Sequence, residues 1–145
     1  MRIELPDLKA MQGFGQRIAA RLQSGDVVAL TGGLGTGKTT LSREILSALG
    51  HEGEVPSPTF TIIETYDHLD PPVVHADFYR LEHPSEAEQL GLDDYREGAA
   101  LLAEWPDHAG GFANEAACLQ ITLEIAGVGR IAVVEPGAGW QGRWP

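Results

Sequence analysis

Cysteine, lysine and long apolar runs are scarce or missing in this sequence of 145 residues. The single cysteine, Cys118, excludes an internal disulfide, which is typical of a protein kept in a reducing compartment. No apolar run approaches the roughly 18 residues of a membrane-spanning helix. Residues 1–20 carry neither the apolar region nor the cleavage signature of a signal peptide. We therefore expect a cytoplasmic protein that has no membrane partner.

Basic residues are also few. Ten lysines and arginines stand against 21 acidic residues, so the formal net charge is −11. Proteins that bind the phosphate backbone of nucleic acids need a basic surface. The excess of acidic residues therefore argues against direct binding of nucleic acid by this chain alone. Only two lysines are present, Lys9 and Lys38. A lysine at position 38, within a glycine-rich stretch, is therefore expected to have a specific task.

The order of apolar and turn-forming residues predicts helices and strands that alternate along the chain. The predicted helices cover residues 8–24, 38–49 and 84–92, and the predicted strands cover 27–31, 61–66, 72–79, 99–105, 118–126 and 130–135. This alternation is typical of an α/β fold with a mainly parallel sheet covered on both faces, and the last two strands form a late antiparallel hairpin. We expect one three-layer domain over residues 1–136. The segment 137–145, which has no periodicity, is expected to be a flexible tail.

Residues 32–39 read GGLGTGKT and fit the phosphate-binding pattern G-x-x-x-x-G-K-[ST], with a predicted strand before it and a helix after it. Glycines let successive N–H groups turn toward phosphate oxygens, and the helix that follows adds its positive end. The nucleotide-binding residues predicted here are Gly35, Thr36, Gly37, Lys38, Thr39 and Thr40. Lys38 is expected to reach the β- and γ-phosphates, Thr39 to ligate Mg²⁺, and Thr40 to contact the α-phosphate.

Two acids end predicted strands. Asp77 follows VVHA and Glu104 follows AALLA. A phosphate loop of this kind needs a carboxylate from a neighbouring strand to hold Mg²⁺, directly or through water. Composition alone does not rank the two, and either acid could merely cap a loop. His75 alternates with Asp77 and is expected to share its face of the strand, where a hydrogen bond within the site competes with a purely structural role.

Five segments in order resemble a known family. They are GGLGTGKTT, VPSPTFTIIETY, VVHADFYRL, LGLDDY and LLAEWPD, and they extend from about residue 27 to 107. A weaker match is GVGR at residues 127–130. Together these blocks resemble the TsaE family (formerly YjeE), bacterial P-loop ATPases required for making threonylcarbamoyladenosine in transfer RNA. The phosphate loop alone would be unspecific, whereas the S-P-T-F, H-x-D-F-Y-R-L and E-W-P blocks together are specific.

The resemblance implies roles for the two acids and their neighbours. Glu104 is expected to be the magnesium-side acid and to partner Thr39 around Mg²⁺. Asp77 is expected to lie near the γ-phosphate and to orient the attacking water or a mobile segment. Ser57 and Thr59 are expected in a switch-like loop that approaches the γ-phosphate.

Three further residues are assigned through the same resemblance. Trp105 is expected to report the nucleotide state or to contact a partner, with a core tryptophan as the alternative. Arg130 is expected near the nucleotide, with a solvated hairpin arginine as the alternative. Leu8 on the first helix is expected to contact the adenine.

The resemblance further implies that ATP and ADP are the nucleotides and that TsaB and TsaD are the partner proteins, with tRNA reached only through that complex. Three other functions remain open. A small-molecule kinase would need an arginine-rich lid, and residues 78–100 hold only Arg80 and Arg96. A GTP-dependent switch commonly carries N-K-x-D, but the only asparagine, Asn114, has no lysine beside it. A nucleotide-dependent scaffold without useful hydrolysis is the third alternative.

Overall fold

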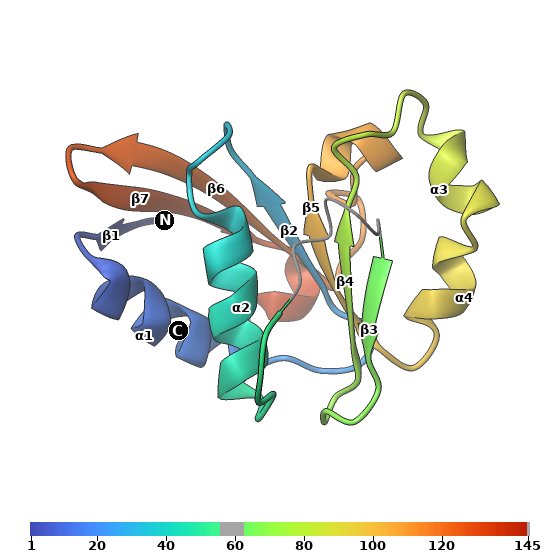
Figure 1. The fold of residues 1–145 in the computed structure, drawn as a ribbon, viewed down its shortest axis with the longest axis horizontal. Coiled ribbons are helices and arrows are strands. Elements are labelled where there is room, and N and C mark those ends of the chain that lie inside the picture. The colour runs from blue at the N-terminus through green and yellow to red at the C-terminus, as the bar shows by residue number, and fades with distance from the viewer. Residues whose placement is uncertain (56–62, 145) are drawn as a thin grey trace.

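The computed structural model of the chain describes residues 1–55 and 63–144. Its middle layer is a seven-stranded sheet in the order β1-β7-β6-β2-β5-β4-β3 (Figure 1). The strands are β1 (Arg2–Leu5), β2 (Val27–Thr31), β3 (Ile63–Tyr66), β4 (Val73–Asp77), β5 (Ala100–Glu104), β6 (Cys118–Ala126) and β7 (Gly129–Pro136). The four central strands β6, β2, β5 and β4 run parallel, while β3, β7 and β1 pair antiparallel at the two sides. The α/β fold with a mainly parallel core is confirmed.

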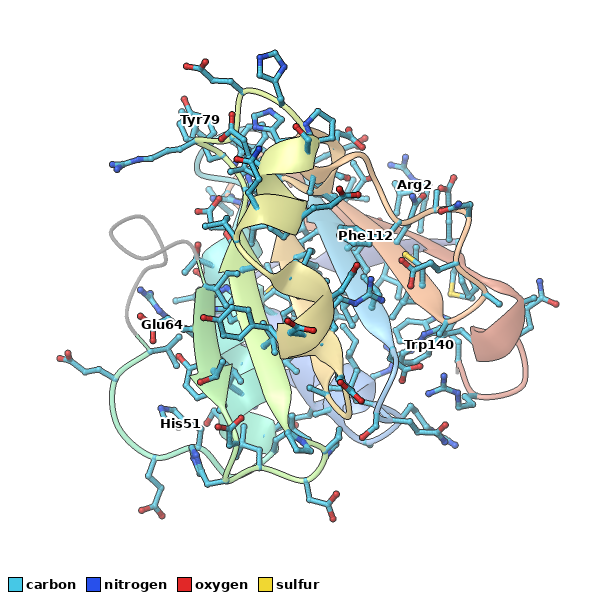
Figure 2. The ribbon with its side chains drawn as sticks, turned by 90° about the vertical axis from the view of Figure 1, so that its right-hand side faces the viewer. Arg2, His51, Glu64, Tyr79, Phe112 and Trp140 are labelled. Carbon is cyan, nitrogen blue, oxygen red and sulfur yellow. The ribbon has the colours of Figure 1, made fainter. Side chains whose placement is uncertain are left out.

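Helices cover both faces of this sheet (Figure 1). The described residues form four α-helices and two 3₁₀ turns. The helices are α1 (Leu8–Ala19), α2 (Lys38–Ala48), α3 (Ser85–Gln89) and α4 (Leu92–Arg96), and the turns are η1 (Pro106–Ala109) and η2 (Ala138–Trp140). The pair α1 and α2 lies on one face, and α3 and α4 lie on the other, where they face the viewer in Figure 2. Within the described residues, no helix combines the length and the apolar character needed to cross a bilayer.

The alternation of side chains along β5 divides the core in two. Leu102 belongs to the cluster under α1 and α2, whereas Leu101 and Ala103 belong to the cluster under α3 and α4. Because successive side chains of a strand point to opposite faces, Glu104 continues the Leu102 side and ends β5 on the α2 face. The register pairs Asp77 of β4 with Glu104, so both acids reach the same edge of the sheet.

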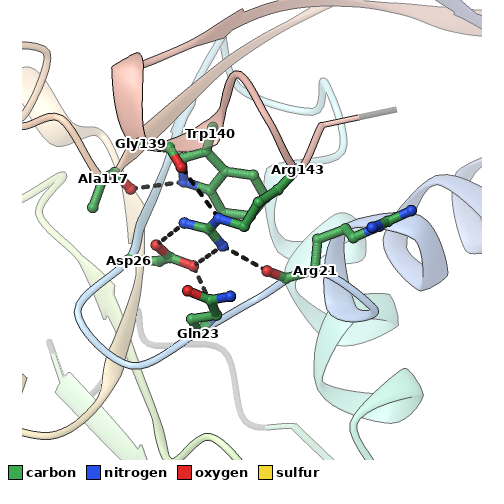
Figure 3. Close-up of polar contacts among 7 residues, drawn as sticks. All are labelled: Arg21, Gln23, Asp26, Ala117, Gly139, Trp140 and Arg143. Atoms are coloured by element: carbon green, nitrogen blue, oxygen red, sulfur yellow. Dashed lines mark hydrogen bonds and ion pairs between the residues drawn. The ribbon is translucent and has the colours of Figure 1, made fainter.

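The C-terminal segment packs against the domain, where the sequence predicts a flexible tail from residue 137. Trp140 is 0% exposed, and its indole N–H donates to the carbonyl of Ala117 at 2.8 Å. Arg143 forms two hydrogen bonds to the carboxylate of Asp26, at 2.6 and 2.8 Å (Figure 3). The segment is held by one aromatic side chain and one ion pair, and not by a helix or strand of its own. The sequence therefore has no periodicity that would have predicted this packing.

Other local differences from the sequence prediction are small. β1 was not predicted, because two of its four residues are charged, yet it gains a full antiparallel pairing with β7. The first helix begins at Leu8 as predicted, with Asp7 as its cap, but it ends at Ala19 rather than at residue 24. Between the predicted helix that ends at residue 92 and the predicted strand that begins at residue 99, the structure has the short helix α4.

Candidate functional site

The glycine-rich segment joins β2 to α2 at the carboxyl edge of the parallel strands. Gly32 has a φ of 141°, and a Cβ atom there would lie 2.6 Å from the carbonyl oxygen of Leu123. Gly37 precedes α2 with a φ of 105°, in the left-handed region that favours glycine. Both positions therefore require glycine. The loop ends where the positive end of an 11-residue helix begins.

A cavity of about 450 Å³ opens beside this loop. It brings together ten of the residues predicted from the sequence: Leu8, Gly35, Gly37, Lys38, Thr39, Thr40, Asp77, Glu104, Trp105 and Arg130. Thr36 does not line the cavity, and its hydroxyl donates to the carbonyl of Gly33 at 2.9 Å inside the loop. Ser57 and Thr59 lie outside the described residues. The cavity thus gathers residues from α1, the loop, α2, β4, β5 and β7.

Lys38 is almost fully buried at the base of the loop. Its Nζ donates to the carbonyls of Gly32 at 2.8 Å and Gly33 at 2.7 Å. The ammonium also lies over the ring of Trp105, 4.4 Å from the centroid. Burial lowers the pKa of Lys38, while the negative charges of Glu104 and Asp77 act in the opposite direction. The lysine is thus a desolvated cation among oxygen atoms, which suits it to anion binding.

Thr39 and Glu104 meet across the cavity floor. The Thr39 hydroxyl donates to Glu104 Oε1 at 2.8 Å. The other carboxylate oxygen, Oε2, lies 2.6 Å from Nε2 of His75. Both Glu104 oxygens therefore have partners, one from α2 and one from β4. The sequence predicts that His75 shares a face of its strand with Asp77. In the structure, the hydrogen-bond partner of His75 is Glu104.

Asp77 lies at the end of β4, beside Glu104. Its Oδ1 accepts a hydrogen bond from the backbone N–H of Tyr79 at 3.0 Å. Burial raises the pKa of Asp77 and the negative charge of Glu104 adds to this, while the Tyr79 N–H, His75 and Lys38 act in the opposite direction. The two strand-end acids therefore have different surroundings. Both line the cavity, but Glu104 has two side-chain partners, whereas Asp77 has the backbone N–H of Tyr79.

An aromatic group covers one side of the cavity. Trp105 has φ 55° and ψ 52°, a left-handed backbone conformation that is uncommon outside glycine. Its ring lies 5.0 Å from that of Tyr79 and 5.5 Å from that of His108, between centroids. Nδ1 of His108 donates to the carbonyls of Phe78 and Tyr79, which ties the turn after β5 to the chain after β4. Trp105 thus lines the cavity beside Lys38 while also packing on the core under α3 and α4.

Arg130, on β7, donates hydrogen bonds to backbone carbonyls of the phosphate loop. Its Nε donates to the carbonyl of Thr36 at 3.1 Å, and Nη2 donates to that of Gly35 at 3.0 Å. The adjacent Gly129 lies close to the end of β1, where a Cβ atom would be 2.7 Å from the carbonyl oxygen of Leu5. Arg130 is therefore held on the loop rather than solvated at the hairpin.

Several lining residues were not found by sequence reasoning. Leu34 in the loop and Val128 at the turn between β6 and β7 are 72% and 99% exposed, and with Leu8 they form an apolar rim around the cavity. Tyr79 lines the cavity too and lies at the end of the molecule away from His51 (Figure 2). Exposed apolar residues in a loop and at a turn were the available signal for Leu34 and Val128.

The oxygen donors fit a hard divalent cation. Mg²⁺ prefers oxygen ligands and usually keeps several waters, binding through one or two protein groups together with substrate phosphates. Thr39 and Glu104 offer a hydroxyl and a carboxylate within 2.8 Å of each other. In the described part of the chain, no three His, Cys, Asp or Glu side chains gather as a self-sufficient metal site. The arrangement therefore suits Mg²⁺ that arrives with a nucleotide.

Comparison with known proteins supplies independent information. The model of the family described as "Threonylcarbamoyl adenosine biosynthesis protein TsaE" matches residues 5–131. A Haemophilus influenzae protein named "tRNA threonylcarbamoyladenosine biosynthesis protein TsaE" is 39% identical over 118 residues, covering 77% of this chain and 75% of the relative. A Synechocystis protein of the same name is 39% identical over 112 residues, covering 74% and 71%. The crystal structure of Bacillus subtilis YdiB superposes with a TM-score of 0.79 at 29% identity, covering 97% of this chain and 88% of YdiB.

Proposed function

This chain belongs to the TsaE family, and on that premise we propose that it is an Mg²⁺-dependent ATPase of threonylcarbamoyladenosine biosynthesis. It would bind ATP at the loop of residues 32–39, hydrolyse it to ADP and phosphate, and act together with TsaB and TsaD on transfer RNA. The observation that supports ATP binding most directly is the convergence of Lys38, Thr39 and Glu104 on one cavity beside that loop.

The phosphate groups of ATP would be held by the loop and by Lys38. The backbone N–H groups of Gly35 to Thr40 and the positive end of α2 favour negative charge. Lys38 would exchange the carbonyls of Gly32 and Gly33 for phosphate oxygens, since its flexible stem lets the ammonium turn within the cavity. Arg130 would keep the loop in shape through the carbonyls of Gly35 and Thr36.

Thr39 and Glu104 would hold Mg²⁺ at the cavity floor. When bound, Mg²⁺ neutralises charge that develops on the phosphate oxygens. Asp77 would orient the attacking water, because it lines the cavity beside Glu104. Ser57 and Thr59, which precede β3 in the sequence, would act near the γ-phosphate.

The apolar rim of Leu8, Leu34 and Val128 would contact the adenine base. These side chains come from α1, the phosphate loop and the β6–β7 turn, so they surround the cavity mouth from three elements. Aromatic bases favour apolar surfaces of this kind, which carry little base specificity on their own.

The partnership with TsaB and TsaD is proposed because the family resemblance implies it, and the chain's charge is compatible with it. A net charge of −11 disfavours direct contact with tRNA and favours a basic protein surface. Nucleotide-dependent changes at Ser57, Thr59 and Trp105 would alter the surface that such a partner contacts.

The experiment is steady-state ATP hydrolysis with Mg²⁺, first by the protein alone and then with purified TsaB and TsaD. We expect a low rate that rises when both partners are present. Glu104→Gln should abolish the rise, because it removes the charge on the magnesium side. Glu97→Gln, at an exposed acid after α4, is the matched control and should leave the rise intact.

Other outcomes would point to the alternatives. Tight nucleotide binding with a rate near zero in both conditions would replace the ATPase with a nucleotide-dependent scaffold. Transfer of the γ-phosphate to an added small-molecule acceptor would identify a kinase. Equal competition by GTP would remove the preference for ATP.

A further inference from the structure

The buried contact between His75 and Glu104 is a polar interaction at the cavity floor to which the proposed function assigns no role. Nε2 of His75 lies 2.6 Å from Oε2 of Glu104, and the two side chains are 0% and 2% exposed. A polar contact so short and so well shielded from water fixes both groups in one geometry. The question is what this geometry does for Glu104.

The strands determine where the imidazole lies. β4 and β5 run parallel with Asp77 opposite Glu104, and His75 precedes Asp77 by two positions on the same face. The imidazole therefore contacts the Glu104 carboxylate from two positions before the end of β4, on the same face of the sheet. Thr39 approaches the other oxygen, Oε1, from the start of α2. Each carboxylate oxygen thus has its own partner, and rotation about the last side-chain bond of Glu104 would break both hydrogen bonds.

The contact with Glu104 also requires a proton on one particular ring nitrogen. A carboxylate only accepts, so Nε2 must carry a proton and donate it. Nδ1 is buried and has no partner among the described residues. The hydrogen bond to Glu104 therefore requires a proton on Nε2 and keeps the imidazole directed at the carboxylate.

We propose that His75 is a positioning residue that fixes the Glu104 carboxylate through Oε2, so that Oε1 stays directed at Thr39, where Mg²⁺ would bind. This inference rests on the proposed function. The principle resembles the outer hydrogen bonds of metal sites, in which a partner of the ligand sets its orientation without touching the metal. Loss of such partners typically lowers metal affinity by about 10- to 100-fold.

Two substitutions separate positioning from simple packing. His75→Leu removes the donor and keeps an apolar side chain of moderate size in the core. His75→Gln keeps an N–H donor at a similar distance from the backbone, without the ring. A residue that only fills space would be replaced better by leucine, whereas a residue that positions Glu104 would be replaced better by glutamine.

The first readout is the Mg²⁺ dependence of nucleotide binding, measured with a fluorescent ATP analogue and the full chain. For His75→Leu we expect the Mg²⁺ concentration for half-maximal effect to rise about 10- to 100-fold, with binding in EDTA unchanged. His75→Gln should recover most of this loss. The inference is overturned if His75→Leu matches the wild type, or if both variants lose Mg²⁺ response to the same extent.

The second readout needs no nucleotide and no folded leucine variant. Nitrogen-15 NMR of the wild-type histidine side chains shows which ring nitrogens carry a proton. We expect a protonated Nε2 for His75, unchanged by added Mg²⁺. Detection of an Nδ1–H tautomer would overturn the assignment.

The two readouts also separate this inference from the proposed function. If wild-type protein binds nucleotide without any response to Mg²⁺, the proposed function and the role of His75 toward Mg²⁺ both fail, even where NMR shows the hydrogen bond. If wild-type protein responds to Mg²⁺ and His75→Leu responds equally, only the role of His75 fails.

Discussion

Asp77 and Glu104 end neighbouring strands, yet their different contacts predict different defects on substitution. Glu104 is engaged by Thr39 and His75, whereas Asp77 is engaged by a backbone N–H and lines the cavity. We expect Asp77→Asn to lower the rate of ATP hydrolysis while leaving the dissociation constant for ATP nearly unchanged, since the amide keeps the acceptor for Tyr79 but loses the base. Single-turnover hydrolysis and equilibrium binding measure the two effects separately. Equal loss of both would make Asp77 a binding residue.

The single cysteine offers a second test at the scale of one residue. Burial raises the pKa of Cys118 to about 11, and the negative charge of Glu115 adds to the rise. At neutral pH its thiolate population should be on the order of a hundredfold below that of a free cysteine, and reagents react with the thiolate. We expect slow labelling by a thiol reagent in the native protein and fast labelling in denaturant. Equal rates would show that the start of β6 is open to solvent.

At the scale of an element, α1 and α2 approach each other closely at one glycine. A Cβ atom on Gly15 would lie 2.7 Å from Cβ and 3.1 Å from the backbone carbonyl carbon of Glu44, whereas a Cβ atom on Gly13 would meet nothing within 4 Å. Gly15→Ala should therefore lower the free energy of unfolding by about 1–3 kcal/mol through overpacking. Gly13→Ala, in the same helix, should raise it by about 0.5–1 kcal/mol. Urea unfolding of both variants tests this, and a stabilised Gly15→Ala would contradict the close approach.

The elements that the sequence predicted well are those with strong local patterns. VVALT reads as a buried strand, the glycine loop and the helix from Lys38 follow from one motif, and the alternation around residues 127–129 indicates the hairpin. β1 could not be predicted in the same way, because RIEL gains its strand character only from pairing with β7. The early end of α1 at Ala19 likewise depends on tertiary contacts, since Leu22 is buried although it lies outside the helix.

The residues of the cavity were likewise predictable where a local pattern marks them and unpredictable where only tertiary structure brings them together. Motif spacing placed Lys38 and Thr39 together, and two strand-end acids pointed to Asp77 and Glu104. The hydrogen bond from His75 to Glu104 could not be predicted, because it depends on the register between β4 and β5, which no local pattern encodes. Leu34 and Val128 were missed because they adjoin the cavity only when the β6–β7 turn lies across from the phosphate loop.

At the scale of the whole molecule, Arg143 ties the C-terminal segment to the start of β2. Asp26 is 2% exposed, and its hydrogen bond raises the pKa of Arg143. Arg143→Met should destabilise the protein by about 1–3 kcal/mol, because the buried carboxylate loses its charged partner and keeps only the N–H of Gln23. Arg43→Met, at an exposed arginine on α2, is the matched control. Thermal unfolding compares them, and equal midpoints for the two variants would show that the ion pair does not hold the segment.

The two outer strands of the sheet bear on how the protein behaves at high concentration. Among the described residues, β1 and β3 comprise four residues each, and both carry charge, Arg2 and Glu4 in β1 and Glu64 in β3. Short, charged edges give a second copy little unpaired backbone to extend the sheet. Mutual repulsion between molecules of net charge −11 acts in the same direction. The fold therefore resists edge-to-edge aggregation at low ionic strength, and added salt weakens the part of that resistance that comes from charge.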